Sequence, residues 1–170
     1  MADEDAGQYD RTCGKGGGNL RLCLTSMPLE HLIYKSRSAM DYPSDQSLSD
    51  ILSVSDRNNR RDGVTGGLVV AARTFLQVLE GDGATLDHAM TRLHADPRHA
   101  DIVILNRQPI AQRRFEGWAM IGAAVKPTRD IVMDELAAFA QFDPDYVIDR
   151  MLTLLADRFP REATRRESRK

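Results

Sequence analysis

The spacing of apolar residues predicts an ordered succession of strands and helices that begins near Leu29. Runs rich in β-branched and aromatic residues predict strands at 32–36, 64–71, 74–80, 102–105 and 117–122. A Ser- and Asp-rich entry at 44–47 predicts a first helix that runs to about Asn59. Leu86, Met90 and Leu93 recur at helical spacing and predict a second helix, which ends at Asp96 because Pro97 follows.

This order of elements predicts an α+β fold of the ferredoxin-like type. The succession strand, helix, hairpin, helix, strand, strand is typical of a five-stranded mixed sheet with two helices on one face. Two further helices are predicted between about residues 129 and 159, with Asp143 as the N-cap of the last one and Pro144 in its first turn.

The last predicted helix carries an apolar stripe that needs a partner surface. The stripe consists of Val147, Met151, Leu154 and Leu155. Either the free face of the sheet or another subunit would satisfy it, and the sequence leaves both open.

Four parts of the chain follow from these patterns. Residues 1–27 are glycine-rich without a hydrophobic period and predict a flexible N-terminal arm. Residues 28–125 form the predicted folded domain, 126–160 a C-terminal helical extension and 161–170 a charged tail.

Composition limits the class of protein. The chain has 170 residues, of which 42% are hydrophobic, which suits one domain with a real core plus appendages. A net charge of −2 gives no reason to expect nucleic-acid binding, and no apolar run approaches the roughly 20 residues of a membrane helix. Cys13 and Cys23 both lie in the predicted arm and form neither a disulfide framework nor a metal site. We therefore expect a cytoplasmic protein without metal, membrane or nucleic-acid partners.

Polar residues interrupt the core-facing stripe of the first predicted helix. Leu48 and Leu52 begin this stripe, and Ser55 and Asn59 continue it, with Asn58 on the flank. A buried amide without a partner costs about 1–3 kcal/mol, so Asn59 needs a hydrogen bond if it faces the core. The alternative is an ordinary polar helix end.

A second polar residue lies on an apolar strand face. Gln77 alternates with Phe75 and Leu79 on one face of the third predicted strand. It is either an edge-strand side chain that reaches water or a buried amide with a partner. Tyr34 in the first strand, and Trp118 with Met120 on one face of the fifth, are ordinary core residues when each is taken alone.

The predicted fold brings these polar residues together, which favours a shared functional role over separate structural ones. In a ferredoxin-like sheet the first and third strands are neighbours beneath the two helices. One pocket between the helices is then expected to be lined by Tyr34, Ser55, Asn59 and Gln77. Apolar walls with a few converging amides suit a flat heteroaromatic ligand, and amides match the donors and acceptors on its edge.

Five motifs in register resemble the BLUF family, the sensors of blue light using flavin. The motifs are LIYKSRS around Tyr34, SDRNNRRDGVTGGL around the two asparagines, FLQVLEG around Gln77, DPRHADIVIL, and RRFEGWAM. The resemblance covers about residues 29–122 and makes 28–125 the flavin-binding domain.

The resemblance implies a role for each matching residue. Tyr34 corresponds to the redox-active tyrosine and Gln77 to the switching amide between that phenol and the flavin. The implied flavin-binding residues are Tyr34, Ser55, Asn58, Asn59, Gln77, Arg98 and His99. Asn59 would hold the carbonyl edge of the ring with Asn58 beside it, and Trp118 and Met120 would respond to light.

The function implied is a blue-light photoreceptor that is not an enzyme. The cofactor is expected to be FAD, with FMN as a possible substitute. Light would drive reversible electron and proton transfer from Tyr34 and rearrange the hydrogen bonds of Gln77, which gives a red-shifted state. The expected partners are a downstream signalling protein and further copies of the chain in a homo-oligomer. The alternative is a light-independent ferredoxin-like regulatory module that binds another small ligand in the same pocket.

Overall fold

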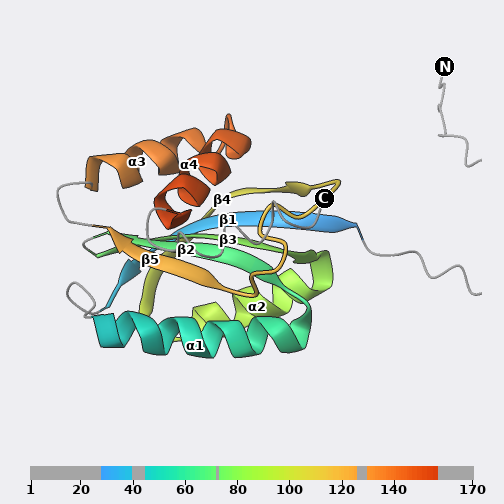
Figure 1. The fold of residues 1–170 in the computed structure, drawn as a ribbon, viewed down its shortest axis with the longest axis horizontal. Helices are drawn as coiled ribbons and strands as arrows, with labels where there is room; N and C mark the ends of the chain where they lie inside the picture. The colour runs from blue at the N-terminus through green and yellow to red at the C-terminus, as the bar shows by residue number, and fades with distance from the viewer. Residues whose placement is uncertain (1–27, 40–44, 72, 126–129, 157–170) are drawn as a thin grey trace, which may run out of the picture.

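A five-stranded sheet lies between two pairs of helices in the computed structural model, which describes residues 28–39, 45–71, 73–125 and 130–156 (Figure 1). The strands are β1 (Leu29–Ser38), β2 (Thr65–Ala71), β3 (Thr74–Asp82), β4 (His99–Pro109) and β5 (Ile121–Val125). The helices are α1 (Asp45–Asp62), α2 (Gly83–Ala95), α3 (Asp130–Phe139) and α4 (Pro144–Ala156).

The strand order is β4-β1-β3-β2-β5. β1 pairs antiparallel with β3 and β4, β2 pairs antiparallel with β3, and β5 runs parallel to β2. Helices α1 and α2 cover one face of the sheet and α3 and α4 the other (Figure 1). The predicted ferredoxin-like α+β fold with a mixed sheet is confirmed. β3 is the central strand, so Gln77 does not lie on an edge.

The two faces of β3 contribute side chains to two separate hydrophobic clusters. Phe75 and Leu79 belong to the cluster beneath α1 and α2, whereas Leu76 and Val78 belong to the cluster beneath α3 and α4. This is the alternation expected of a strand that is covered on both sides.

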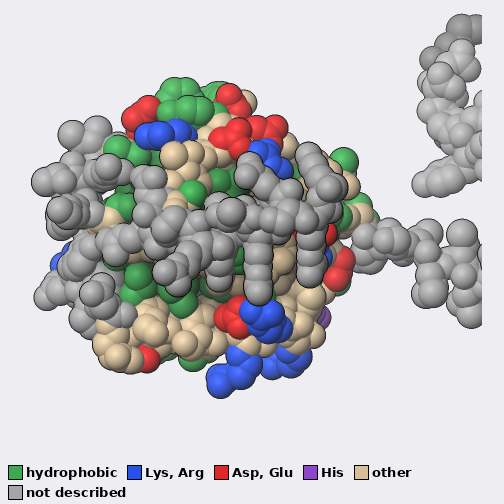
Figure 2. All heavy atoms as spheres, viewed as in Figure 1, with side chains coloured by type: hydrophobic (Ala, Val, Ile, Leu, Met, Phe, Trp, Pro, Cys, Tyr) green, Lys and Arg blue, Asp and Glu red, His purple; other side chains and the backbone are tan. Residues whose placement is uncertain are grey.

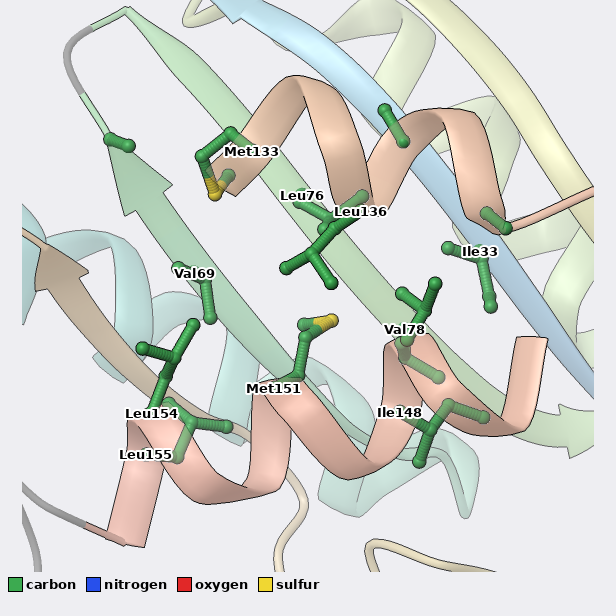
Figure 3. Packing of buried hydrophobic residues seen from close by; sticks show 14 of the residues in the cluster. Ile33, Val69, Leu76, Val78, Met133, Leu136, Ile148, Met151, Leu154 and Leu155 are labelled. Carbon is green, nitrogen blue, oxygen red and sulfur yellow. The ribbon is translucent and has the colours of Figure 1, made fainter. Parts of the chain in front are cut away.

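The apolar stripe of α4 packs on the sheet of its own chain. Figure 3 shows Met151 directed at the strands close to Val69 and Val78, with Leu136 of α3 beside it. The α4 residues Val147, Ile148, Met151, Leu154 and Leu155 are buried. At the start of α4, Asp143 Oδ1 accepts a hydrogen bond from the Tyr146 backbone N–H at 2.9 Å, which is the predicted N-cap. Of the two partner surfaces left open by the sequence, the sheet is the one used.

The prediction for the fifth strand was wrong at its start. β5 begins at Ile121, so Trp118 and Met120 precede it. Gly117 has a φ of +86°, and the Trp118 N–H donates to the Phe115 carbonyl at 3.0 Å in a turn. The predicted pairing of Trp118 and Met120 on one face is also wrong. Trp118 packs against the cluster beneath α3 and α4, and Met120 belongs to the cluster beneath α1 and α2.

Aromatic residues reach the surface at the turn between α3 and α4. Phe142 is 84% exposed, and the rings of Phe139 and Tyr146 meet edge to face with centroids 5.3 Å apart. Figure 2 shows hydrophobic and acidic side chains gathered over these helices.

Some predictions concern parts of the chain that the structure does not describe. The predicted arm at 1–27 and charged tail at 161–170 lie outside the described residues. Within the described ranges, none of the helices is both long enough and apolar enough to span a bilayer.

Candidate functional site

The polar end of α1 faces the sheet. Asn59 is buried, and its Nδ2 donates to the backbone carbonyl of Ala119 at 2.8 Å. Because α1 continues to Asp62, Asn59 lies inside the helix and not at a frayed end. Its amide therefore connects α1 to the segment that leads into β5.

The register of the central strands places Tyr34 directly opposite Gln77. The two side chains share one face of the sheet, and the Tyr34 hydroxyl donates to Gln77 Oε1 at 2.5 Å. On its other side Gln77 Nε2 lies 3.7 Å from Met120 Sδ, as a weak donor contact. All three side chains are buried. The amide is thus held between a phenol and a thioether.

The environment of Tyr34 keeps it a phenol. The side chain is completely buried, and this burial raises the pKa of Tyr34 far above its ordinary value, with the nearby negative charge of Asp96 as a smaller cause. At physiological pH the hydroxyl carries its proton and donates it to Gln77 Oε1.

A cavity of about 70 Å³ lies between α1 and α2 on the side of the sheet that carries Gln77. Its walls are formed by Val54, Ser55, Asn58, Asn59, Gln77, Leu79, Ala89, Arg92, Leu93, Asp96 and Arg98. Five of the seven residues implied as flavin ligands line it. The other two, Tyr34 and His99, are not among these lining residues, and Tyr34 lies one hydrogen bond behind Gln77.

An ion pair forms the part of the wall that follows α2. Arg98 binds both carboxylate oxygens of Asp96, with Nε 2.9 Å from Oδ1 and Nη2 2.5 Å from Oδ2. The hydrogen bonds from the Arg98 side chain are the main reason that the pKa of Asp96 lies below its ordinary value. Arg98 remains partly exposed, so its guanidinium can also face a ligand.

His99 is partly buried and lies near Tyr34. Its Nδ1 is 2.8 Å from Ser36 Oγ, and its ring centroid is 4.8 Å from that of Phe75 and 6.3 Å from that of Tyr34. Burial lowers the pKa of His99, with the Asp96 charge acting in the opposite direction. Burial therefore favours the neutral form of this ring, which lies beside Phe75 and Tyr34.

Several wall residues were not expected from the sequence. Leu79 lies two residues after Gln77 on the same strand face, and Ala89 and Leu93 are one helical turn apart on α2. The sequence marks these as core positions without indicating that a cavity borders them. Arg92 joins the wall while its Nη2 binds Asp62 Oδ2 at 2.7 Å.

A buried phenol–amide–thioether row beside a polar-walled cavity between two helices is the arrangement expected of an α+β module that binds a flat polar ligand. The model of the BLUF family, described as sensors of blue light using FAD, matches residues 29–121. The chain therefore belongs to the BLUF family of flavin-dependent blue-light sensors.

Known relatives agree with this assignment. Photoactivated adenylate cyclase subunit beta of Euglena longa is 33% identical over 93 residues, which are 54% of this chain and 11% of the relative. The chain thus matches only about a tenth of the length of this curated relative. The dark-state structure of BlrB, a BLUF protein, is similar with a TM-score of 0.61 and 29% identity, over 76% of this chain and 97% of that one. Klebsiella pneumoniae BlrP1, solved with FMN and cyclic diGMP, gives a TM-score of 0.52 and 30% identity over 69% of this chain and 36% of that one.

The chemistry of the cavity fits the FAD used by this family. Gln77, Asn58 and Asn59 bring amides to it, and isoalloxazine presents donors and acceptors that amides match. Asn59 uses one N–H for Ala119, which leaves its Oδ1 as an acceptor. The cavity is smaller than the roughly 300–1,000 Å³ that ligand pockets usually enclose, so side chains of the wall have to shift for the ring to enter.

Proposed function

We propose that this protein is a blue-light photoreceptor in which Tyr34 and Gln77 carry out the photochemistry. The observation that supports this most directly is the hydrogen bond from the buried Tyr34 hydroxyl to Gln77 Oε1 at 2.5 Å. Ser55, Asn58, Asn59 and Arg98 would hold the flavin, together with the part of the Gln77 amide that lines the cavity.

The photochemical part of the proposal is a reversible transfer that starts at Tyr34. When bound, the flavin absorbs blue light, and in its excited state it is a strong oxidant. The Tyr34 phenol would give one electron to that oxidant and pass its hydroxyl proton along the existing hydrogen bond toward Gln77 Oε1, and it would later recover both. Burial favours this pairing because no water competes for the hydroxyl.

The lasting change in the proposal is at Gln77. A carboxamide is a donor at one end and an acceptor at the other, so rotation or tautomerisation exchanges its hydrogen bonds without a covalent change. In the dark arrangement Oε1 faces Tyr34 and Nε2 faces Met120. The exchanged arrangement presents a new donor to the flavin carbonyl, which shifts the absorption to the red.

The remaining part of the proposal concerns how the light signal leaves the domain. The domain itself senses light and turns over no substrate, and the altered Gln77 arrangement is passed to a partner protein or to further copies of the chain. Met120 is the first candidate for this step because it contacts Gln77 directly. FAD is the proposed resident flavin, and FMN, which is present in the BlrP1 structure, would be accepted as a substitute.

A pair of absorption spectra tests the proposal. The purified chain is loaded with FAD, and its spectrum is recorded in the dark, after blue light, and again after a dark interval. We expect the flavin bands to move to the red and to return without bleaching. Protein that takes up no flavin, or that binds flavin with identical spectra before and after illumination, would instead favour the light-independent regulatory module.

A further inference from the structure

Glu80 is a fully buried carboxylate on β3 that the proposed photochemistry does not use. It lies three residues beyond Gln77, on the opposite face of the strand. Its Oε1 accepts from the Arg114 backbone N–H at 2.7 Å, and its Oε2 accepts from the Phe115 backbone N–H at 3.0 Å and from Thr65 Oγ1 at 2.8 Å. A carboxylate that accepts three hydrogen bonds fixes the path of the chain that supplies the donors.

Arg113 binds the backbone of Glu80 and the side chain of Thr65. Its Nη1 donates to the Glu80 backbone carbonyl at 2.5 Å and to Thr65 Oγ1 at 2.9 Å, and its Nη2 donates to the Gly63 carbonyl at 2.8 Å. We call Glu80, Thr65 and Arg113, with the N–H groups of residues 114 and 115, the Glu80 clamp. It joins the β2–β3 hairpin to the start of the segment that leads into β5.

From the Glu80 clamp the chain runs to Met120, whose side chain contacts Gln77. The Gly66 N–H donates to the Trp118 carbonyl at 3.1 Å, and Asn59 Nδ2 donates to the Ala119 carbonyl at 2.8 Å. Met120 follows at once and places Sδ against Gln77 Nε2. Strong hydrogen bonds thus fix the backbone of residues 114–119, whereas the Met120 contact at 3.7 Å is weak and depends on where that backbone lies.

We infer that Glu80 is a positioning residue for the Gln77 switch and acts through Met120. This inference rests on the proposed function. The carboxylate never touches Gln77 or the flavin cavity. By fixing residues 114 and 115 it determines where Met120 Sδ sits, and so how well the dark arrangement of the Gln77 amide is held.

Replacement of Glu80 by glutamine loosens the clamp by about one hydrogen bond. The new amide keeps an oxygen for the Phe115 N–H and the Thr65 hydroxyl, but it turns an NH₂ group toward the Arg114 N–H. Met120 Sδ is then held less firmly against Gln77. The dark arrangement of the amide is therefore stabilised less, and the return to it becomes slower. A weak contact of this kind corresponds to about a two- to fivefold slower dark recovery.

A double-mutant cycle on FAD-loaded protein tests the inference. Dark recovery after a blue-light pulse is measured for the wild type, Glu80→Gln, Met120→Leu and the double variant. Met120→Leu keeps the volume and removes the sulfur acceptor. We expect Glu80→Gln to slow recovery in the wild-type background and to leave it unchanged in the Met120→Leu background. The matched control is Glu135→Gln, the same substitution on an exposed position of α3, which should recover at the wild-type rate.

The possible results separate the inference from the proposed function. A wild type without a light-induced shift overturns both. A responsive wild type with equal slowing by Glu80→Gln in both backgrounds, or with none in either, overturns the role of Glu80 alone. If Glu80→Gln does not fold, Thr65→Val takes its place in the cycle, because it removes one donor to the carboxylate and leaves the backbone donors in place.

Discussion

Replacement of Gln77 by leucine separates the fold from the proposed photochemistry. Leucine is similar in size to glutamine and suits this position, because Phe75 and Leu79 flank it on the same face. The substitution removes both the acceptor of the Tyr34 hydroxyl and the donor to Met120.

The stability cost of this substitution is moderate. The Tyr34 hydroxyl is fully buried and loses its partner, which costs about 1–3 kcal/mol. Burial of the leucine side chain offsets about 1.5–3 kcal/mol of this cost. The net change in unfolding free energy therefore lies between a gain of about 2 kcal/mol and a loss of about 1.5 kcal/mol, so the melting temperature drops by at most roughly 10 °C. The variant stays folded at room temperature, since domains have about 5–15 kcal/mol of stability.

The light response, in contrast, should disappear completely. Leucine has no donor or acceptor to exchange, so the excited state can relax only to the original arrangement. The assay is the light-minus-dark difference spectrum of FAD-loaded Gln77→Leu, with thermal unfolding of the same sample. Gln108→Leu, the same change on an exposed position of the edge strand β4, serves as the control and should keep the full response. A reversible red shift of wild-type size in Gln77→Leu would refute the assignment of the switch to this amide.

Three further predictions follow from the same contacts. Tyr34→Phe leaves Gln77 Oε1 without its donor, so unfolding free energy in urea should fall by about 1–3 kcal/mol and the light-induced shift should be lost; a preserved shift would remove Tyr34 from the photochemistry. Asn59→Ala leaves the Ala119 carbonyl unpaired, with a similar loss of stability and weaker FAD binding in a fluorescence titration, whereas unchanged FAD affinity would confine Asn59 to a structural role. Burial lowers the pKa of His99 below its unfolded value of about 6.5, so the unfolded chain binds more protons as the pH falls through that value and stability decreases below it. His99→Gln should therefore flatten the fall in melting temperature between about pH 7 and pH 5, and an unchanged slope would assign that fall to other groups.

The sequence predicts the fold well because each element has its own periodicity. The alternation around Gln77 and the helical spacing from Leu86 to Leu93 are local signals that survive without tertiary information. The proximity of Tyr34 and Gln77 follows from these signals only once β1 and β3 are taken as neighbours. Their direct opposition in the ladder is a matter of register, which the two strands do not specify by themselves.

The start of β5 was missed for a long-range reason. The run from Gly117 to Gly122 contains the β-formers Trp118 and Ile121, yet its first residues bond elsewhere. The Trp118 carbonyl accepts from Gly66, and the Ala119 carbonyl is taken by a side chain of α1, namely Asn59. A local sequence pattern does not predict hydrogen-bond partners that lie more than 50 residues away. The contact of His99 with Ser36 was likewise beyond the sequence, since it depends on the register of β1 and β4.

The energetics limit how a signal can leave the site. Exchange of one or two hydrogen bonds at Gln77 changes the free energy by about 0.5–1.5 kcal/mol each, whereas moving an element from 1:99 to 99:1 takes roughly 5.5 kcal/mol. The Glu80 end of the segment before β5 is held by several short hydrogen bonds and cannot be displaced by so small a change. The Met120 end is held to Gln77 by the weak 3.7 Å sulfur contact. The free energy of such a contact is comparable to the free-energy change of the amide exchange. Under the proposed mechanism, a light-driven change would therefore begin at Met120, stay small, and shift the population of states that already lie close in energy.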